Sequence, residues 1–118
     1  MTKKIQIIED EASLSTPLKA VLEKSGYTVF VEPHGDKAVD AVKEHNPDLV
    51  LMDIILPGKT GWDIIESIGK DYKVIAMSSL DSPEREYELI SKGAIAYLVK
   101  PNTSLDEILK LVEAALAQ

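Results

Sequence analysis

Apolar residues along this chain occur in short continuous runs that alternate with segments in which apolar residues recur every three or four positions. The runs cover residues 5–8, 27–31, 49–52, 74–77 and 95–99. Runs of this length, rich in β-branched residues and bounded by turn residues, are typical of strands buried on both faces. The sequence therefore predicts five strands, and the run at 49–52 has the composition of a strand buried on both faces.

The segments after these runs have the spacing of amphipathic helices. Gly26 ends the first segment, and Ser82-Pro83 is a typical start for the fourth, because proline is tolerated in a first helical turn. We expect Tyr87 and Ile90 to face the core from this fourth helix. Ser104 and Glu107 form a capping-box pattern before the last helix.

A strand followed by a helix, five times over, predicts an α/β domain whose parallel sheet is covered by helices on both faces. The chain has 118 residues, which is the size of one ordinary domain. It contains no low-complexity segment and no linker, so we interpret residues 1–118 as a single domain.

The composition excludes several classes of protein. The formal net charge of −7 opposes binding to DNA, RNA or an anionic membrane surface. The absence of cysteine excludes disulfides, thiolate metal sites and cysteine nucleophiles. The longest apolar stretch is far shorter than the roughly 20 residues that a transmembrane helix needs. We therefore expect a cytoplasmic protein with no membrane contact and no direct contact with nucleic acid.

Polar residues follow four of the five predicted strands. Glu9 and Asp10 come after the first, Asp53 after the third, Ser78 after the fourth and Lys100 after the fifth. In an open α/β sheet, ligands bind at the carboxyl ends of the strands. With a strand order of 2-1-3-4-5 the first and third strands are neighbours, and the three acids converge in one pocket.

Three carboxylates at short range repel one another by about 1 to 4 kcal/mol for each pair. Such a pocket needs a cation, and a set of oxygen ligands without histidine or cysteine favours Mg²⁺. Asp53 is then available as a nucleophile towards phosphorus. Ser78 and Lys100 are suited to bind the oxygens of a phosphoryl group. The two histidines, His34 and His45, are predicted to have surface roles.

The whole set resembles the receiver domain of the two-component response regulators. The resemblance runs from Lys4 to Leu116 and rests on IIEDE (7–11), LVLMDIILPGKTGWDII (49–65), VIAMSSL (74–80) and AYLVKP (96–101). Pro57 and Gly61 also follow the central aspartate at the spacing of the family. The resemblance implies a flavodoxin-like, doubly wound sheet of five parallel strands in the order 2-1-3-4-5 with five helices.

The resemblance also implies a function. Asp53 is expected to accept a phosphoryl group from a histidine kinase or a histidine phosphotransfer protein. Asp10, Asp53 and the backbone carbonyl of Ile55 are expected to ligate Mg²⁺, with Glu9 acting through water. Such a domain is a signalling phosphoacceptor rather than an enzyme, although it assists its own phosphorylation and autodephosphorylation. The downstream effector is not implied.

Other residues have switching or contact roles in this resemblance. Ser78 corresponds to the hydroxyl switch residue of the family. Tyr97 corresponds to the aromatic switch residue, which turns from exposed to buried. Lys100 corresponds to the phosphate-binding lysine, and its bond to Pro101 is expected to be cis. The apolar side chains of Ile55 and Leu80 predict slow loss of the phosphoryl group. Partner contacts are expected at the start of the first helix (Ala12, Leu14, Ser15) and in the loop after Asp53.

Three alternatives fit the sequence less well. A phosphatase of the haloacid dehalogenase type needs a second acid two residues after the nucleophile, where this chain has Ile55. A flavodoxin needs a phosphate loop after the first strand, where Glu9-Asp10-Glu11 would repel phosphate. A degenerate receiver that only binds proteins would not need the intact set of acids and lysine.

The sequence departs from the family pattern at two places. Ser78 stands in place of threonine, and the uncharged Ile95-Ala96 pair argues against a charged dimer face.

Overall fold

The computed structural model describes residues 2–100 and 103–117. Strands and α-helices alternate in the predicted order. The strands are β1 (Lys4–Ile8), β2 (Thr28–Glu32), β3 (Leu49–Asp53), β4 (Val74–Ser78) and β5 (Ala94–Val99). The helices are α1 (Ala12–Lys24), α2 (Ala38–His45), α3 (Gly61–Ile68), α4 (Pro83–Ser91) and α5 (Leu105–Leu116), and the short 3₁₀ helix η1 (Gly35–Lys37) precedes α2.

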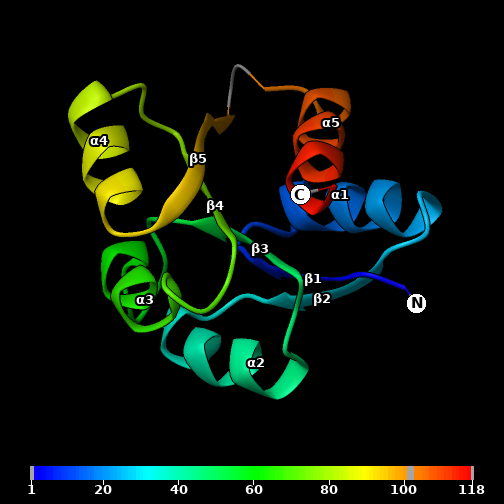
Figure 1. Cartoon of the computed structure of the whole chain (residues 1–118), viewed down its shortest axis with the longest axis horizontal. Helices are drawn as coiled ribbons and strands as arrows, with labels where there is room; N and C mark the ends of the chain where they lie inside the picture. The colour runs from blue at the N-terminus through cyan, green and yellow to red at the C-terminus, as the bar shows by residue number, and fades with distance from the viewer. Residues whose placement is uncertain (1, 101–102, 118) are drawn as a thin grey trace.

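The strands form one parallel sheet in the order β2-β1-β3-β4-β5 (Figure 1). This confirms the predicted flavodoxin-like, doubly wound fold. In the register of the sheet, Ile8 lies opposite Met52, and Asp53 lies opposite Met77. The residues that follow β1 therefore leave the sheet next to the end of β3, as the sequence predicts.

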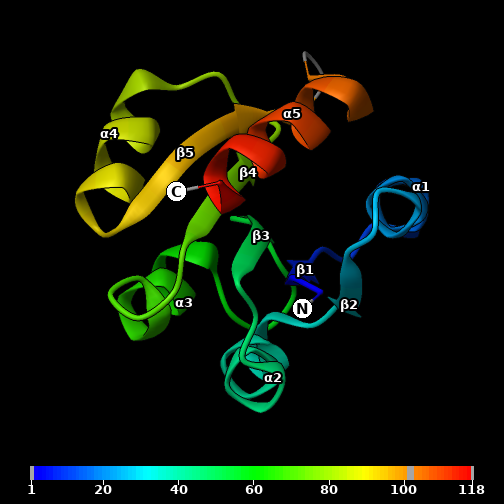
Figure 2. The same cartoon turned by 45° about the vertical axis from the view of Figure 1, so that its right-hand side comes forward.

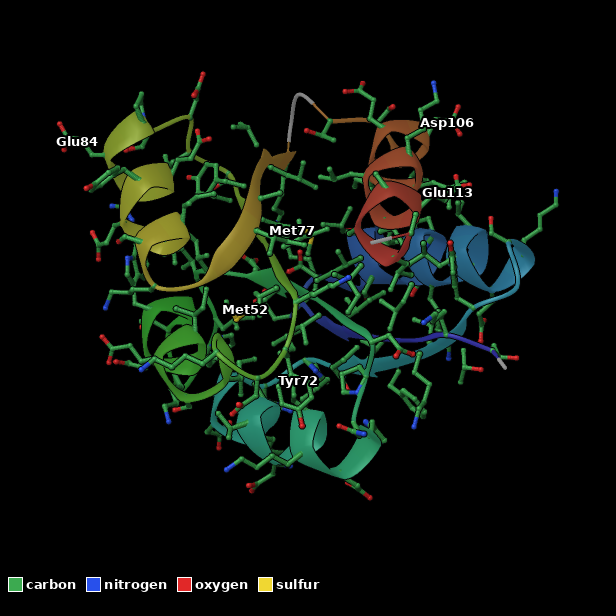
Figure 3. All side chains as sticks on the ribbon, in the orientation of Figure 1. Met52, Tyr72, Met77, Glu84, Asp106 and Glu113 are labelled. Atoms are coloured by element: carbon green, nitrogen blue, oxygen red, sulfur yellow. The ribbon has the colours of Figure 1, made fainter. Side chains whose placement is uncertain are left out.

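The helices cover both faces of the sheet and bury a separate apolar core on each (Figure 2). Helices α2, α3 and α4 pack on one face, and α1 and α5 pack on the other. Met52 points into the first core and Met77 into the second, whereas Glu84, Asp106 and Glu113 lie at the periphery (Figure 3). All residues of β3 and β4 are buried because helices cover both of their faces, which explains their nearly continuous apolar sequences.

Side-chain capping interactions mark the starts of α4 and α5. The Ser104 hydroxyl accepts a hydrogen bond from the Glu107 N–H, and the Glu107 carboxylate accepts one from the Ser104 N–H. This confirms the predicted capping box of α5. The Ser82 hydroxyl accepts a hydrogen bond from the Arg85 N–H, with Pro83 as the first residue of α4. In the helices of the described ranges, no apolar segment is long enough to cross a membrane.

The predicted inward face of α4 is wrong. Tyr87 is 76% exposed and Ile90 is 42% exposed, whereas Leu89 is fully buried. Helix α4 packs near the edge of the sheet against β5 and buries only this one residue. A short helix that contacts the core through one residue has no apolar periodicity that could reveal its inward face.

Two further sequence predictions need correction. His34 is exposed, as predicted, but His45 is half-buried. The His45 ring stacks on Phe30 with ring centroids 3.8 Å apart. Its Nδ1 lies 2.7 Å from the side-chain amide oxygen of the buried Gln6. Ser15, predicted to contact partners, is buried, because this position of α1 faces the sheet. The predicted cis bond at Pro101 lies outside the described residues.

Candidate functional site

The five polar residues singled out from the sequence all lie at the carboxyl ends of the strands. Asp53 is the last residue of β3, and Ser78 is the last residue of β4. Glu9 and Asp10 directly follow β1, and Lys100 directly follows β5. The structure thus places these residues at one edge of the sheet, where β1 and β3 pair side by side.

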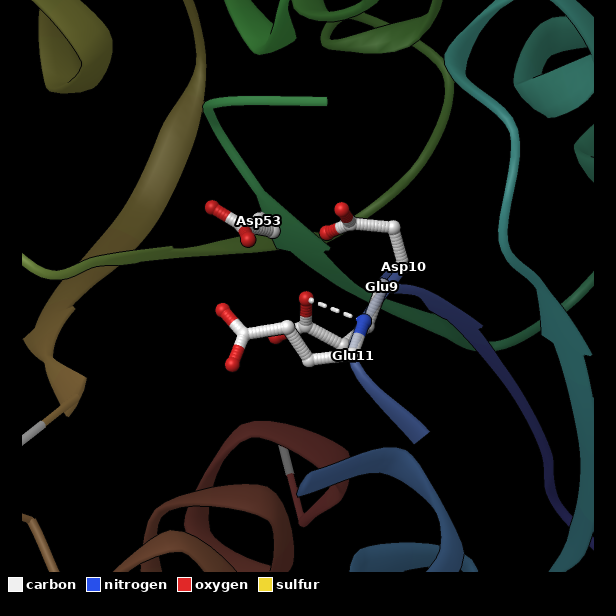
Figure 4. A group of neighbouring side chains, drawn as sticks. All are labelled: Glu9, Asp10, Glu11 and Asp53. Atoms are coloured by element: carbon white, nitrogen blue, oxygen red, sulfur yellow. Dashed lines mark hydrogen bonds between the residues drawn. The ribbon is translucent and has the colours of Figure 1, made fainter. Parts of the chain in front are cut away.

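An acidic cluster occupies this edge (Figure 4). One carboxylate oxygen from each of Glu9, Asp10, Glu11 and Asp53 lies within 4.8 Å of the others. Glu9 and Asp53 are buried, whereas Asp10 and Glu11 are exposed. Sequence reasoning identified three of these acids and missed Glu11. Its position next to Asp10 in the sequence was the available signal, but an acidic residue just before a helix commonly only stabilises the amino end of that helix.

Lys100 sits between the buried acids. Its Nζ lies 2.9 Å from Glu9 Oε1 and 3.0 Å from Asp53 Oδ2, and it is 3.6 Å from Glu11 Oε1. The lysine side chain is 14% exposed, and the side chains of Glu9 and Asp53 are 0% and 6% exposed. The ammonium group therefore partly neutralises a set of carboxylates that burial would otherwise strongly destabilise.

Burial and these ion pairs change the pKa values of two groups in opposite ways. Burial raises the pKa of Glu9 to about 7, because the effect of the neighbouring Lys100, which lowers it, is smaller. Burial alone would lower the pKa of Lys100, but its interactions with Glu9 and Asp53 outweigh that effect and raise it above the usual value. Lys100 is therefore charged at neutral pH, whereas Glu9 can exchange a proton there.

The site fits a hard divalent cation. Glu9 Oε1 is buried and, among the described residues, its one close polar neighbour is the ammonium group of Lys100, which lies 2.9 Å away as an ion pair. The available donors are carboxylate and backbone oxygens, which suit Mg²⁺. One ammonium group cannot neutralise four carboxylates, so a cation here would relieve the remaining repulsion between neighbouring acids.

The loop after β3 holds the Asp53 carboxylate in place. The Ile55 N–H donates a hydrogen bond of 3.1 Å to Asp53 Oδ1, while Lys100 donates one of 3.0 Å to Oδ2. One oxygen therefore contacts a neutral donor and the other a cation. The backbone of Ile55, the predicted source of a carbonyl ligand, lies beside the carboxylate, and its side chain is 53% exposed.

The loop after β4 connects Ser78 to Tyr97. The Leu80 N–H donates a hydrogen bond of 3.0 Å to Ser78 Oγ, and the Tyr97 hydroxyl donates one of 2.7 Å to the Leu80 carbonyl oxygen. Tyr97 is half-buried and packs against the core under α3 and α4. Both predicted switch residues thus contact the same backbone position, Leu80.

Comparisons with known proteins agree with this arrangement. A model of the response regulator receiver domain family matches residues 5–113. The BeF₃-activated N-terminal receiver domain of RstA from Klebsiella pneumoniae is 33% identical, with a TM-score of 0.89 over 98% of this chain and 99% of that one. The receiver domain of Francisella response regulator 1452 is 26% identical, with a TM-score of 0.91 over 98% of each chain.

A CheY-like response regulator receiver domain protein from Methanospirillum hungatei is also similar. It is 26% identical, with a TM-score of 0.92, and the match covers 99% of this chain and 95% of that one. The family match, the strand order and the acids that meet at the carboxyl edge all agree with the resemblance seen in the sequence. This chain therefore belongs to the receiver domain family of the two-component response regulators.

Proposed function

We propose that this receiver domain accepts a phosphoryl group on Asp53 in a Mg²⁺-dependent reaction. The observation that carries the proposal is the contact of 3.0 Å between Lys100 Nζ and Asp53 Oδ2 beside the cluster of Glu9 and Asp10. A buried aspartate paired with a lysine at a site for a hard cation can bind the negatively charged oxygens of a phosphoryl donor.

The proposed donor is a phosphohistidine on a histidine kinase or phosphotransfer protein. A carboxylate oxygen of Asp53 attacks phosphorus, and the bond between phosphorus and the imidazole nitrogen breaks. The electron pair of that bond stays on the nitrogen, and the product is an acyl phosphate at Asp53. The acidic net charge of −7 is the reason we assign no direct nucleic-acid contact to this chain.

The residues present suit separate roles in this transfer. Glu9, Asp10, Asp53 and the carbonyl of Ile55 would hold Mg²⁺, which when bound supplies positive charge opposite the phosphoryl oxygens. Lys100 moves from the Asp53 carboxylate to a phosphoryl oxygen as the new bond forms. Ser78 donates its hydroxyl hydrogen to another phosphoryl oxygen.

We further infer that Ser78, Leu80 and Tyr97 transmit the modification to the surface. When the Ser78 hydroxyl turns to the phosphoryl group, its hydrogen bond from the Leu80 N–H is lost or lengthened. The Leu80 carbonyl, which binds the Tyr97 hydroxyl, then shifts with the same loop. The rotation of Tyr97 from exposed to buried stays a prediction, supported by its half-buried position and its bond to this loop.

Phosphorylation by a small donor tests the proposal directly. We expect intact mass spectrometry to show one phosphoryl adduct after incubation with acetyl phosphate and Mg²⁺. The adduct should be absent in Asp53→Asn and in the presence of EDTA, and it should persist in Asp71→Asn, which changes an exposed aspartate. The absence of an adduct with every donor tried would overturn the proposal.

Loss of the phosphoryl group is expected to be slow. Ile55 and Leu80 carry apolar side chains, 53% and 47% exposed, on the two loops next to Asp53, and neither can orient an attacking water. We expect Ile55→Asn and Leu80→Asn each to increase the rate of phosphoryl loss by about tenfold, because an amide can position water. The rate is measured by mass spectrometry after removal of the donor. A wild-type half-life of seconds would contradict this prediction.

A further inference from the structure

The connection between β2 and α2 contacts the loop after Asp53, which we call the acceptor loop (residues 54–60). The Gly35 N–H donates a hydrogen bond of 3.0 Å to the Pro57 carbonyl oxygen. A Cβ atom at position 35 would lie 2.2 Å from the Lys59 carbonyl oxygen and 2.9 Å from the Lys59 nitrogen. The two backbones thus touch at a distance that only glycine permits, although the residues lie on different crossovers of the fold.

The contact holds the middle of a loop whose ends are already fixed. The Ile54 N–H donates to the Met77 carbonyl of β4 at 3.1 Å, and the Gly61 N–H donates to the Ile54 carbonyl at 2.9 Å. Between these points Gly58 has a φ of +89°, a backbone conformation that favours glycine. The hydrogen bond from Gly35 is made in this middle part, two residues after Ile55.

The contact therefore bears on the chemistry of the site. Ile55 donates its N–H to the Asp53 carboxylate and is the proposed source of the backbone carbonyl ligand. A loop held at both ends and in the middle keeps these two backbone groups in a fixed direction. A loop released in the middle would sample other directions and would bind a cation less tightly.

We propose that Gly35 is a positioning residue for the phosphoryl-transfer site, acting through the backbone of the acceptor loop. This inference rests on the proposed Mg²⁺-dependent function. Because coupling between two positions is reciprocal, occupation of the metal site must in turn stabilise the contact between Gly35 and Pro57. The β2–α2 connection is then a part of the molecule that responds to the state of the site.

Two glycine substitutions separate this role from a loss of stability. Gly35→Ala introduces the clash with the acceptor loop. Gly69→Ala is the matched control, because its Cβ would also clash with backbone, at 2.7 Å from the Ile65 and Lys92 carbonyl oxygens. These atoms lie near the amino end of β5, whereas the acidic cluster lies at the carboxyl ends of the strands. Both variants should lower the thermal midpoint. Only Gly35→Ala should weaken Mg²⁺ binding, by about tenfold, in an NMR titration of the folded protein.

The outcomes distinguish the inference from the function on which it rests. Wild-type protein that binds Mg²⁺, together with a Gly35→Ala variant of equal affinity, would overturn the positioning role alone. Wild-type protein that binds no Mg²⁺ would overturn both. With acetyl phosphate, saturating Mg²⁺ should restore the phosphorylation rate of Gly35→Ala towards that of the wild type. A rate that stays low at saturating Mg²⁺ would count against positioning of the metal ligands.

Hydrogen exchange tests the same inference in the unmodified protein, so it applies even if Gly35→Ala does not fold. The amide of Gly35 should exchange more slowly when Mg²⁺ is added, because metal binding favours the closed contact. The control is the amide of Asn46 at the other end of α2, which donates to the Val42 carbonyl at 2.8 Å. Its exchange should not change. An unchanged rate at Gly35 under saturating Mg²⁺ would overturn the proposal.

Discussion

Lys100→Met is expected to lower the rate of phosphorylation by small donors by about 100-fold, the loss typical of removing one charge-stabilising group from a reaction site. The variant should also lose about 2 kcal/mol or more of unfolding free energy at pH 8 without Mg²⁺. Methionine nearly matches lysine in length and packing, so the change removes chiefly the charge. The measurements are phosphoryl incorporation by mass spectrometry and urea unfolding.

Both effects follow from the position of the ammonium group. Lys100 Nζ lies 2.9 Å from Glu9 and 3.0 Å from Asp53, and both acid side chains are almost fully buried. Without the lysine, two buried carboxylates face each other with no cation between them. One of them then takes up a proton, which limits the loss of stability. Added Mg²⁺ should therefore restore more stability to Lys100→Met than to the wild type.

Lys92→Met provides the matched control. Lys92 also forms an ion pair, with Glu66, but Glu66 is 61% exposed and the pair lies on the surface between α3 and α4. Exposed pairs contribute little to stability, so this variant should unfold almost as the wild type does. It should also be phosphorylated at the wild-type rate. If Lys100→Met were as stable and as readily phosphorylated as Lys92→Met, the lysine would have no role in the site.

The fold was predictable because the central strands are buried on both faces. In β3 and β4 every residue is buried, so their sequences are nearly continuous apolar runs, and the carboxylate at the end of β3 stands out against them. The position of Asp53 was therefore evident from the local sequence. Its convergence with Glu9 followed once the strand order was assumed, because that order brings β1 beside β3. Lys100 follows β5, two strands from β3, but at the same carboxyl end of the sheet.

The features that sequence analysis missed all depend on contacts between distant segments. Gly35 looks like an ordinary turn glycine, and only the structure shows that it touches Lys59. The ring of His45 stacks on Phe30, a pairing that no local periodicity can reveal. The inward face of α4 was predicted wrongly because Leu89 is its only buried residue. Local patterns report burial along one element, whereas these contacts depend on how the elements pack together.

The raised pKa of Glu9 predicts that the unfolding free energy decreases as pH rises. Burial raises the pKa from 4.5 to about 7 in the folded state. Between these two pH values the folded protein holds a proton that the unfolded chain has released, so the unfolding free energy falls as pH rises. The contribution is fully present below pH 4.5 and is lost above pH 7. Over that window the change amounts to about 3 kcal/mol.

Glu9→Gln should remove this dependence, because its amide does not titrate. We expect the variant to be more stable than the wild type at pH 8, by about 2 to 3 kcal/mol, and to differ little from it at pH 5. The measurement is urea unfolding across this range of pH. Glu11→Gln is the control: its carboxylate belongs to the same cluster but is 62% exposed, so the pH profile should stay that of the wild type.

The proton on the Glu9 carboxyl group must leave when a cation binds. Mg²⁺ favours the charged form of Glu9, so its affinity for the wild type should rise between pH 6 and pH 8, on either side of the pKa of about 7. Calorimetric titrations in buffers of different ionisation enthalpy should detect proton release near pH 7, and Glu9→Gln should bind Mg²⁺ with little release. Equal proton release by the two proteins would show that another group titrates. In that case the burial of Glu9, although complete in the structure, would not control the charge of the site.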